Sequence, residues 1–306
     1  MINLTEPMVE LRAELNGINN SLLKTYPVES CAEHLEAYPQ SGYYSYVGPK
    51  VLEFSNGILE KVGPFALATY QKLLLLELIS RNRAKVEKSD LPIKIKQLYE
   101  QNFARILTDV VERRQSVDFY HYDNDKFKKD IGLCNLRIIP AGTQKINRCK
   151  LPVGVLKRNG ALQNIRFITY VVGILHGIGP VFDMHTDSHD PDLMANFSPE
   201  GWKQYYLNVA DVMCIQTDII GLFGIGWFFD PKLAQVSPRL AYLRELVCES
   251  GGRIFEVGPS AGARESALAT SPSRNKLFEE GKYTPKDFLV VWDRKSLLGW
   301  AKLNNQ

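Results

Sequence analysis

The chain has 306 residues, of which 45% are apolar and 23% are charged, as in a soluble globular protein that can bury an ample core. The 37 basic and 34 acidic residues leave a net charge of +3, which argues against a dedicated nucleic-acid binder. No run approaches 18 apolar residues, and the N-terminus carries acids where a signal peptide has a basic start. The sequence therefore predicts a cytoplasmic protein without a membrane span.

The cysteines are odd in number and scattered, without a CxxC pair: Cys31, Cys134, Cys149, Cys214 and Cys248. This spacing predicts neither a disulfide framework nor a zinc knuckle. Buried or unreactive thiols are the expected outcome. The basic neighbours of Cys149 in NRCKLP would lower the pKa of a thiol, but no partner histidine is evident nearby.

Residues 1–130 are predicted to form a mainly helical region. The segment 64–85, PFALATYQKLLLLELISRNRAK, has an apolar middle and a basic end, which is typical of a buried helix. The segment 93–114 carries an apolar stripe at helical spacing, which we expect to face a core or an interface: Ile95, Leu98, Phe103, Ile106, Leu107, Val110 and Val111. Residues 38–57, rich in Tyr, Gly, Pro and Ser, predict an ordered loop or short hairpin, and the polar segment 118–130 predicts a domain boundary.

Residues 131–306 alternate between strand-type and helix-type segments. Strands are predicted near 135–142, 180–187, 218–229, 253–257 and 287–293, and helices near 161–177, 198–213, 237–252, 271–282 and 294–303. The helix near 161–177 is expected to align Leu162, Ile165, Ile168, Val172 and Leu175 on one face. We predict an α/β domain with a layered mixed sheet and flanking helices, preceded by the mainly helical region.

Three predicted helices begin with the same dipeptide: Ser198-Pro199, Ser237-Pro238 and Ser271-Pro272. A serine oxygen accepts hydrogen bonds from the N–H groups of a first helical turn, and proline there loses nothing because its missing N–H would be unpaired. Each Ser-Pro pair is therefore expected to cap a helix.

The segment FDMHTDSHDPD, residues 182–192, holds the strongest candidate site. Asp183, His185, Asp187 and His189 alternate, so an extended strand would place them on one face. The end of a strand is where α/β proteins gather binding groups. The plain alternative is a solvated strand end whose aspartates cap a turn. As a site, His185 is the expected proton acceptor, oriented by Asp183 or Asp187.

The same side chains predict a competing metal site for iron, manganese or zinc, with His185, Asp187 and His189 as ligands. Side chains two apart on a strand are separated by about 6–7 Å, so such a site would need a further ligand from elsewhere. His185-Thr186-Asp187 resembles the first half of the facial triad of 2-oxoglutarate oxygenases, but no histidine follows position 189. A metallohydrolase remains the other metal-dependent alternative.

Further polar residues follow the later strands. Gly221, Gly224 and Gly226 lie inside an apolar run and predict a strand that admits close approach of a neighbouring backbone or ligand. Asp230 would share a sheet edge with His185 if the two strands are parallel. Arg264 and Arg274, in and after a segment of small residues, are candidates for receiving a phosphate or carboxylate.

Two resemblances add to these observations. Residues 130–301, through IIPAGTQ, MHTDSHDPDLMANFSPEGW, GWFFDPKLAQVSPRLAYLRE, ALATSPSRNKLFEEGKYTP and VVWDR, resemble a family of uncharacterised bacterial proteins, which implies no activity. The order strand (181–187), helix (198–213), strand (219–229), helix (238–249), strand (253–257) resembles the second half of the GNAT acyltransferase superfamily. That likeness implies an acyl-CoA or similar thioester along 181–187, its pyrophosphate at Ser198, and Tyr242 as a general acid. The superfamily's Gln/Arg-x-x-Gly-x-Gly/Ala loop is absent from 188–198, and 164–177 looks helical where a hairpin is expected.

These observations leave three functions open. The first is a GNAT-like transferase that moves an acyl group from a thioester to the amine of a small molecule, with His185 or a neighbouring acid as base. The second is a metal-dependent enzyme that uses the cluster at 183–190. The third is a non-catalytic protein that binds a partner through its aromatic loops: Tyr43, Tyr44, Tyr46, Phe119, Tyr120 and Tyr122.

Overall fold

The computed structural model describes residues 3–38, 46–151, 161–187, 193–269 and 271–305. The chain divides into two compact units. Unit 1 contains residues 1–141 and 187–190, and unit 2 contains residues 142–186 and 191–306. The position 130/131, where the sequence suggested a boundary, lies inside helix α7 (Asp125–Cys134).

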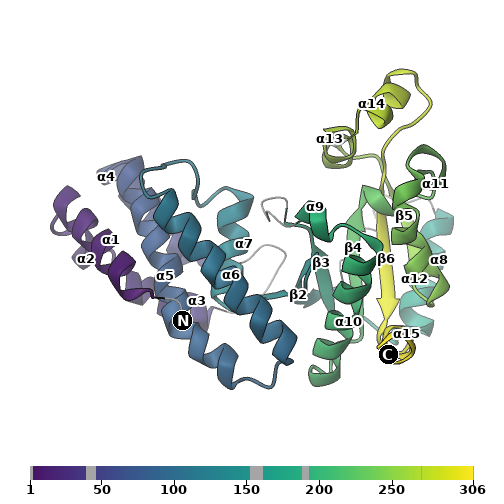
Figure 1. Cartoon of the computed structure of the whole chain (residues 1–306), viewed down its shortest axis with the longest axis horizontal. Helices are drawn as coiled ribbons and strands as arrows, with labels where there is room; N and C mark the ends of the chain where they lie inside the picture. The colour runs from purple at the N-terminus through teal and green to yellow at the C-terminus, as the bar shows by residue number, and fades with distance from the viewer. Residues whose placement is uncertain (1–2, 39–45, 152–160, 188–192, 270, 306) are drawn as a thin grey trace. The chain divides into compact units, whose positions relative to one another are not determined.

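Unit 1 is helical in the part that the structure describes (Figure 1). Its elements are α1 (Thr5–Ile18), α2 (Leu22–Thr25), α3 (Val28–Ala37), α4 (Gly48–Lys61), α5 (Pro64–Lys88), α6 (Ile93–Glu112), α7 and the short strand β1 (Ile138–Pro140). Helix α5 packs against α1, α3, α4, α6 and α7, and this central position explains its long run of buried apolar side chains. The two helices predicted at 64–85 and 93–114 are thereby confirmed.

In the segment 38–57, predicted as a loop or hairpin, residues 39–45 lie outside the described part of the chain, and the residues from 48 onward are helical. Residues 48–57 form the beginning of α4, with Pro49 in the first turn. Proline is tolerated there because the first N–H groups of a helix have no intrahelical acceptor. The helix buries Val51, Phe54 and Ile58, which recur at helical spacing behind the Gly-Pro start.

A buried carboxylate, Asp130, joins α6 to α7. It accepts from Arg105 at 2.5 Å, from Lys126 at 3.0 Å and from the Tyr120 hydroxyl at 3.0 Å. A carboxylate that is 1% exposed requires such partners, because burial without them would be very costly. On α6 the predicted stripe is largely buried, although Val111 is 51% exposed.

Two of the six aromatic residues proposed for partner binding are buried within unit 1. Tyr46 and Tyr120 are buried, and the rings of Phe119 and Tyr120 meet edge to face with centroids 4.9 Å apart. Tyr43 and Tyr44 lie outside the described residues. Internal packing is therefore the role that the structure gives to the buried members of this group.

Unit 2 is a mixed α/β domain. Its elements are β2 (Lys145–Lys150), α8 (Ala161–Gly173), β3 (Pro180–His185), α9 (Leu193–Asn196), α10 (Pro199–Ile215), β4 (Gly221–Gly226), the 3₁₀ turn η2 (Trp227–Phe229), α11 (Leu233–Val236), the 3₁₀ turn η3 (Pro238–Leu240), α12 (Tyr242–Glu249), β5 (Arg253–Gly258), α13 (Ala261–Ala269), α14 (Pro272–Glu279), β6 (Asp287–Asp293) and α15 (Arg294–Asn304). Its strands follow the order β2-β3-β4-β6-β5. Strands β3 and β4 are parallel, whereas β2/β3, β4/β6 and β5/β6 are antiparallel. The predicted fold class is confirmed.

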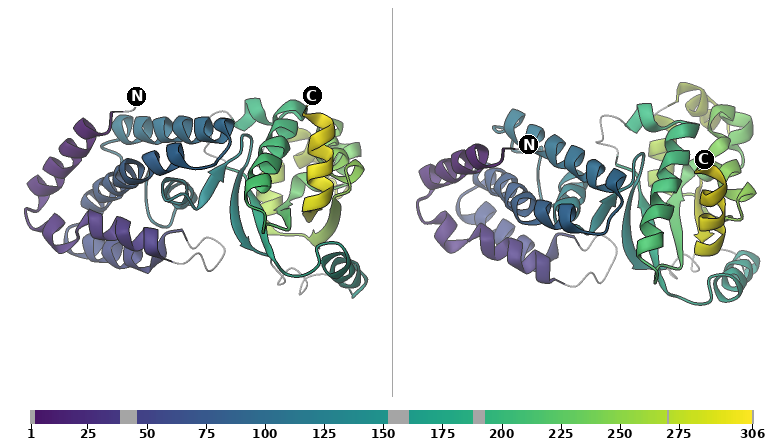
Figure 2. Two further views of the ribbon diagram at one scale, coloured as in Figure 1. Left: turned by 90° about the horizontal axis from the view of Figure 1, so that it is seen from below. Right: turned by 60° about the horizontal axis from the view of Figure 1, so that its bottom comes forward.

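Helices cover both faces of this sheet. On one face, Phe167, Tyr170 and Val171 of α8 form a buried cluster with strand residues that include Val181 and Phe223. On the other face, α10 and α15 lie side by side, as both views in Figure 2 show. Their aromatic rings stack on β6: Tyr206 and Trp300 lie 5.1 Å and 5.4 Å from the ring centroid of Trp292.

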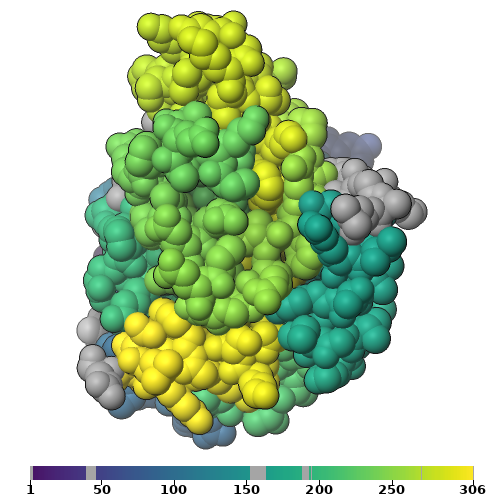
Figure 3. All heavy atoms as spheres, turned by 90° about the vertical axis from the view of Figure 1, so that its right-hand side faces the viewer, coloured from purple at the N-terminus to yellow at the C-terminus, as the bar shows by residue number. Residues whose placement is uncertain are grey.

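Helix α8 buries a different face from the predicted one. Ile165, Ile168 and Val172 are 60%, 48% and 66% exposed, while the sheet is covered by Phe167 and Tyr170. Both faces of α8 are apolar, so the larger aromatic side chains bury more surface against the strands. Figure 3 shows the teal helix α8 at the surface of unit 2.

Two of the three Ser-Pro pairs cap helices as predicted. The Ser198 oxygen accepts from the N–H of Gly201 at 3.2 Å, and the Ser271 oxygen accepts from the N–H of Arg274 at 3.4 Å. Ser237 precedes the short turn η3 and makes no side-chain cap. Its oxygen accepts instead from the Arg274 side chain at 3.0 Å.

All five cysteines are free, as the sequence predicted. None of the helices in the described part of the chain combines the length and the apolar character that a membrane crossing requires.

Candidate functional site

The candidate site of unit 2 is built on the antiparallel pair β2/β3. In its register Asn147 lies opposite Asp183, and Lys145 lies opposite His185. Paired residues share a face of the sheet, and so do residues two apart along a strand. The pairing therefore gathers Lys145, Asn147, Asp183 and His185 on one face, continuous with Val181 of the α8 cluster.

The imidazole of His185 is the centre of this group. Its Nε2 lies 3.2 Å from Oδ2 of Asp183 and makes a short hydrogen bond with Oδ1 of Asn147. Both neighbouring atoms are acceptors, which favours the tautomer with the proton on Nε2 and the lone pair on Nδ1. Asp183, Asn147 and His185 are 1%, 1% and 4% exposed, so the sequence-based alternative of a solvated strand end is wrong.

Asn147 was not predicted from the sequence. It lies 38 residues before His185 on β2, and the local signal is weak, because polar side chains occur on both faces of this strand: Lys145 and Asn147 on one, Arg148 and Lys150 on the other. A second contact joins the same segments, since the Thr186 hydroxyl donates to Oε1 of Gln144 at 2.6 Å. The register of β2 against β3 brings the Asn147 amide to the imidazole.

Asp187 and His189 do not continue the strand. Strand β3 ends at His185, and Asp187 is buried two residues later, in the part of the chain grouped with unit 1. There its charge acts on Arg105, whose principal carboxylate partner is Asp130. His189 lies outside the described residues. The predicted alternation therefore holds within β3 for Asp183 and His185.

Two buried tyrosines, Tyr205 and Tyr206, lie on α10, which covers the face of the sheet opposite Asp183 and His185. Burial raises the pKa of the Tyr205 hydroxyl, and the nearby Tyr206 and Asp183 raise it further. Burial also raises the pKa of Tyr206, with a contribution from Tyr242. Tyr242 is the first residue of α12, and burial raises its pKa to about 12. Among the described residues, none hydrogen-bonds to the hydroxyl of any of these three tyrosines.

Asp230 occupies a different neighbourhood. Strands β3 and β4 are parallel, which is the condition under which the sequence placed Asp230 and His185 at the same edge of the sheet. Asp230 follows the turn η2 after β4. Its Oδ1 accepts from the N–H of Lys232 at 2.9 Å, and burial raises the pKa of the carboxyl. The charges that act on it come from Lys232, Lys286 and Glu256, near β5 and the start of β6. No contact joins Asp230 to His185 among the described atoms.

The three predicted cofactor-binding residues lie in different settings. Ser198 caps α10. Arg264 is exposed on α13. Arg274 is 1% exposed: its guanidinium donates to the carbonyl of Ala267 at 2.8 Å and lies 4.6 Å from the ring centroid of Trp227.

The metal alternative finds no support in the described residues, where no group of three or more His, Cys, Asp or Glu side chains is arranged to hold an ion. The expectation that basic neighbours lower the pKa of the Cys149 thiol is also corrected. Burial raises the pKa of its thiol to about 12, and the charge of Asp183 adds to this effect, so the basic neighbours do not activate it. A Cβ at Gly221 would lie 2.8 Å from the carbonyl oxygen of Trp292, which is the predicted close approach of a neighbouring backbone. At Gly224 the neighbour is a side chain, with Cε of Met184 at 2.2 Å.

Comparisons with known proteins complete the description. No family model and no curated protein matches the chain, so the resemblance to an uncharacterised bacterial family gains no support. An acyltransferase in complex with decanoyl-CoA and teicoplanin has a similar structure, with a TM-score of 0.45, 11% identity, and coverage of 95% of this chain and 99% of that one. A mutant acyltransferase in complex with octanoyl-CoA has a TM-score of 0.45 and 12% identity over 89% of this chain and 86% of that one. At these TM-scores the likeness decides nothing about the substrate of this chain.

Proposed function

We propose that unit 2 transfers an acyl group from a coenzyme A thioester to an amine, with a GNAT-like arrangement around β3 and β4. The observation that carries the proposal is the parallel pair itself. Its ladder contains two residue pairs, Phe182–Leu222 and Asp183–Phe223, although β3 continues to His185 and β4 to Gly226. On its other edge β3 pairs with β2 over six residue pairs, and β4 pairs with β6 over six.

The edges of β3 and β4 that face one another beyond this ladder suit an extended ligand with amides. Such a ligand binds a strand edge through backbone N–H and C=O groups, as an added strand does. The pantetheine arm of coenzyme A is an extended chain with two amides. Helix α10 follows β3 along the chain, and the N-terminus of a 17-residue helix favours the pyrophosphate. The Ser198 oxygen caps the helix, so the proposed contact would come from the first turn as a whole.

In the proposed reaction the amine nitrogen attacks the thioester carbonyl carbon. A C–N bond forms, the C–S bond breaks, and coenzyme A leaves as a thiolate. His185 would accept the amine proton on Nδ1, while Asp183 and Asn147 hold Nε2–H and stabilise the imidazolium. Asp187 would add negative charge nearby, as the sequence suggested.

Tyr242 would protonate the departing thiolate. A tyrosine hydroxyl with a pKa of about 12 is neutral at pH 7 and therefore carries a proton to give. Its buried hydroxyl has no hydrogen-bond partner among the described residues, which is the condition expected of a group that awaits a ligand. Asp230 would act farther away, on the bound amine.

Binding is tested first. Thermal unfolding of the full chain is followed with acyl-CoA thioesters of increasing chain length, and with adenosine diphosphate as a control nucleotide. A saturating thioester at about 100 times its Kd would stabilise the fold by about 2.7 kcal/mol. Absence of any stabilisation across the series would reject the proposal.

Catalysis is tested by thiol release with a panel of amines. His185→Gln is expected to lower kcat by about 10²–10⁴-fold, the range for loss of a general base, with unchanged thioester binding. His176→Gln, at an exposed position, is the matched control. Tyr242→Phe removes one oxygen and is expected to slow the reaction of thioesters with poor leaving groups most. Full turnover by His185→Gln would remove His185 from the mechanism.

A further inference from the structure

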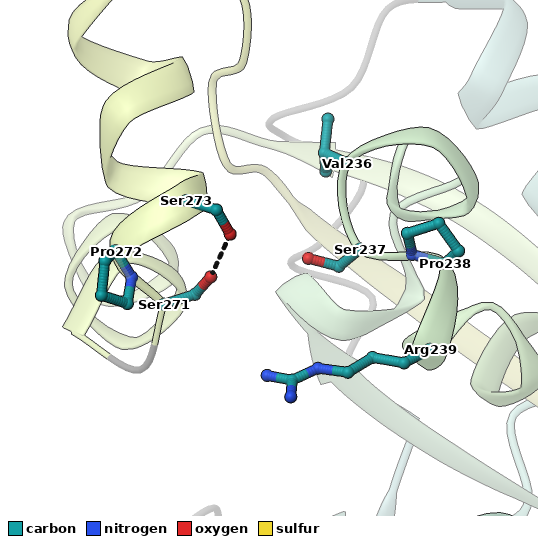
Figure 4. Close-up of a pocket in the computed structure, with 7 residues that line it drawn as sticks. All are labelled: Val236, Ser237, Pro238, Arg239, Ser271, Pro272 and Ser273. Atoms are coloured by element: carbon teal, nitrogen blue, oxygen red, sulfur yellow. Dashed lines mark hydrogen bonds between the residues drawn. The ribbon is translucent and has the colours of Figure 1, made fainter.

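A pocket of about 430 Å³ in unit 2 has none of the residues of the His185 group in its lining (Figure 4). It is lined by Val236, Ser237, Pro238 and Arg239 on one side, and by Ser271, Pro272 and Ser273 on the other. Two Ser-Pro pairs from distant parts of the sequence thus form one cavity. We propose that this pocket binds a phosphate monoester.

The hydroxyl groups of the pocket are arranged as donors. The Ser237 oxygen accepts from the Arg274 guanidinium at 3.0 Å, so its own O–H hydrogen is available for another acceptor. Ser271 accepts from the N–H of Arg274, and its hydroxyl lies 3.0 Å from that of Ser273. One hydrogen of this pair bridges the two oxygens, and the other can point to a ligand.

Two arginines add positive charge. The Arg239 side chain extends from η3 toward Ser271 and Ser273 (Figure 4), and in the described part of the chain it forms no ion pair. Arg274 is buried behind the wall of the pocket, against Trp227. Burial lowers the pKa of Arg274, Tyr283 opposes this effect, and the charge of Arg239 lowers it further. An anion between the two walls would relieve that repulsion.

The donors and the size of the pocket select the ligand class. Hydroxyl hydrogens and a guanidinium on opposite walls match the three terminal oxygens of a phosphate better than the two of a carboxylate. The N-terminus of α14, which carries a partial positive charge, also faces the pocket. A cavity of 430 Å³ exceeds the phosphate itself, and Val236, Pro238 and Pro272 offer apolar surface to the organic remainder.

Direct binding of inorganic phosphate to the full chain tests the proposal, with sodium chloride at equal ionic strength as the reference. Arg239→Gln is expected to weaken phosphate binding at least about tenfold, the effect of one charged hydrogen-bonding group. Ser273→Asp is expected to abolish it while preserving the fold, since an acid in the first turn favours a helix. Arg244→Gln, an exposed arginine outside the pocket, is the charge-matched control. The proposal is overturned if wild type shows no phosphate binding beyond that of chloride, or if Arg239→Gln binds like wild type.

The phosphate can belong to coenzyme A or to another molecule, and a second arm separates these sources. If it is the 3′-phosphate of coenzyme A, wild type binds coenzyme A more tightly than dephospho-coenzyme A, and Arg239→Gln removes that difference. If it belongs to a phosphorylated acceptor, the two cofactors bind equally and inorganic phosphate does not compete with them. The binding measurement with inorganic phosphate does not depend on acyl transfer, so failure of one proposal does not imply failure of the other.

Discussion

The contact between Gly224 and Met184 offers a sharp test of the packing between β3 and β4. A Cβ at Gly224 would lie 2.2 Å from Cε and 3.0 Å from Cβ of Met184, whereas non-bonded carbons prefer about 3.5–4.0 Å. The Cε atom can turn away, but the Met184 Cβ is fixed to β3. Because Met184 is 6% exposed, its side chain has little room to move. Gly224→Ala is therefore expected to destabilise the fold by about 1–3 kcal/mol.

A second substitution shows whether that collision is the cause. Met184→Ala alone leaves a cavity and is expected to cost about 2–5 kcal/mol. In its background Cε, 2.2 Å from the new methyl group, is gone and only the 3.0 Å approach of the retained Cβ remains, so Gly224→Ala costs less than in wild type. The double-mutant cycle should then give a favourable coupling of about 1–3 kcal/mol.

Urea unfolding of the four chains gives the free energies. Gly299→Ala on α15 is the matched control: no atom lies within 4 Å of its added Cβ, and alanine in a helix is expected to gain about 0.5–1 kcal/mol. Additive costs for Gly224→Ala and Met184→Ala, within about 0.5 kcal/mol, would refute the reasoning.

Three further outcomes follow from buried charges. Asp230→Asn is expected to stabilise the fold at pH 7 because burial raises the pKa of the carboxyl. The gain should vanish below about pH 4 in urea unfolding, where the unfolded carboxyl is also protonated. Burial lowers the pKa of Lys72 to about 8, so between pH 8 and 10.5 the unfolded lysine binds a proton that the native one has lost, and wild type should gain stability relative to Lys72→Met as pH rises through that window in denaturant titrations. Asp130→Asn leaves the buried cations Arg105 and Lys126 with Asp109 as their one shared carboxylate among the ion pairs of the described residues, and it should cost up to about 3–5 kcal/mol in urea unfolding, whereas exposed Asp118→Asn should cost little.

Much of the architecture could be predicted from the sequence because strands, helices and caps depend on residues that are close along the chain. The oxygens of Ser198 and Ser271 cap helices through residues three positions away, so the dipeptide Ser-Pro suffices to place the starts of α10 and α14. The alternation in PVFDMH likewise places Asp183 and His185 on one face of β3 before any partner strand is known. These features involve short separations along the chain and few alternatives.

Partner choice over long separations was decided by the tertiary structure. Helix α8 has two apolar faces, and its pattern could not tell that Phe167 rather than Ile165 would be buried, because the sheet offers the better contact to the aromatic ring. Asn147 meets His185 through the register of β2 and β3, which backbone hydrogen bonds between two strands determine together. Ser237 is a further example of a distant partner. A local pattern predicted that Ser237 would cap a helix, but its oxygen accepts a hydrogen bond from the guanidinium of Arg274, 37 residues away.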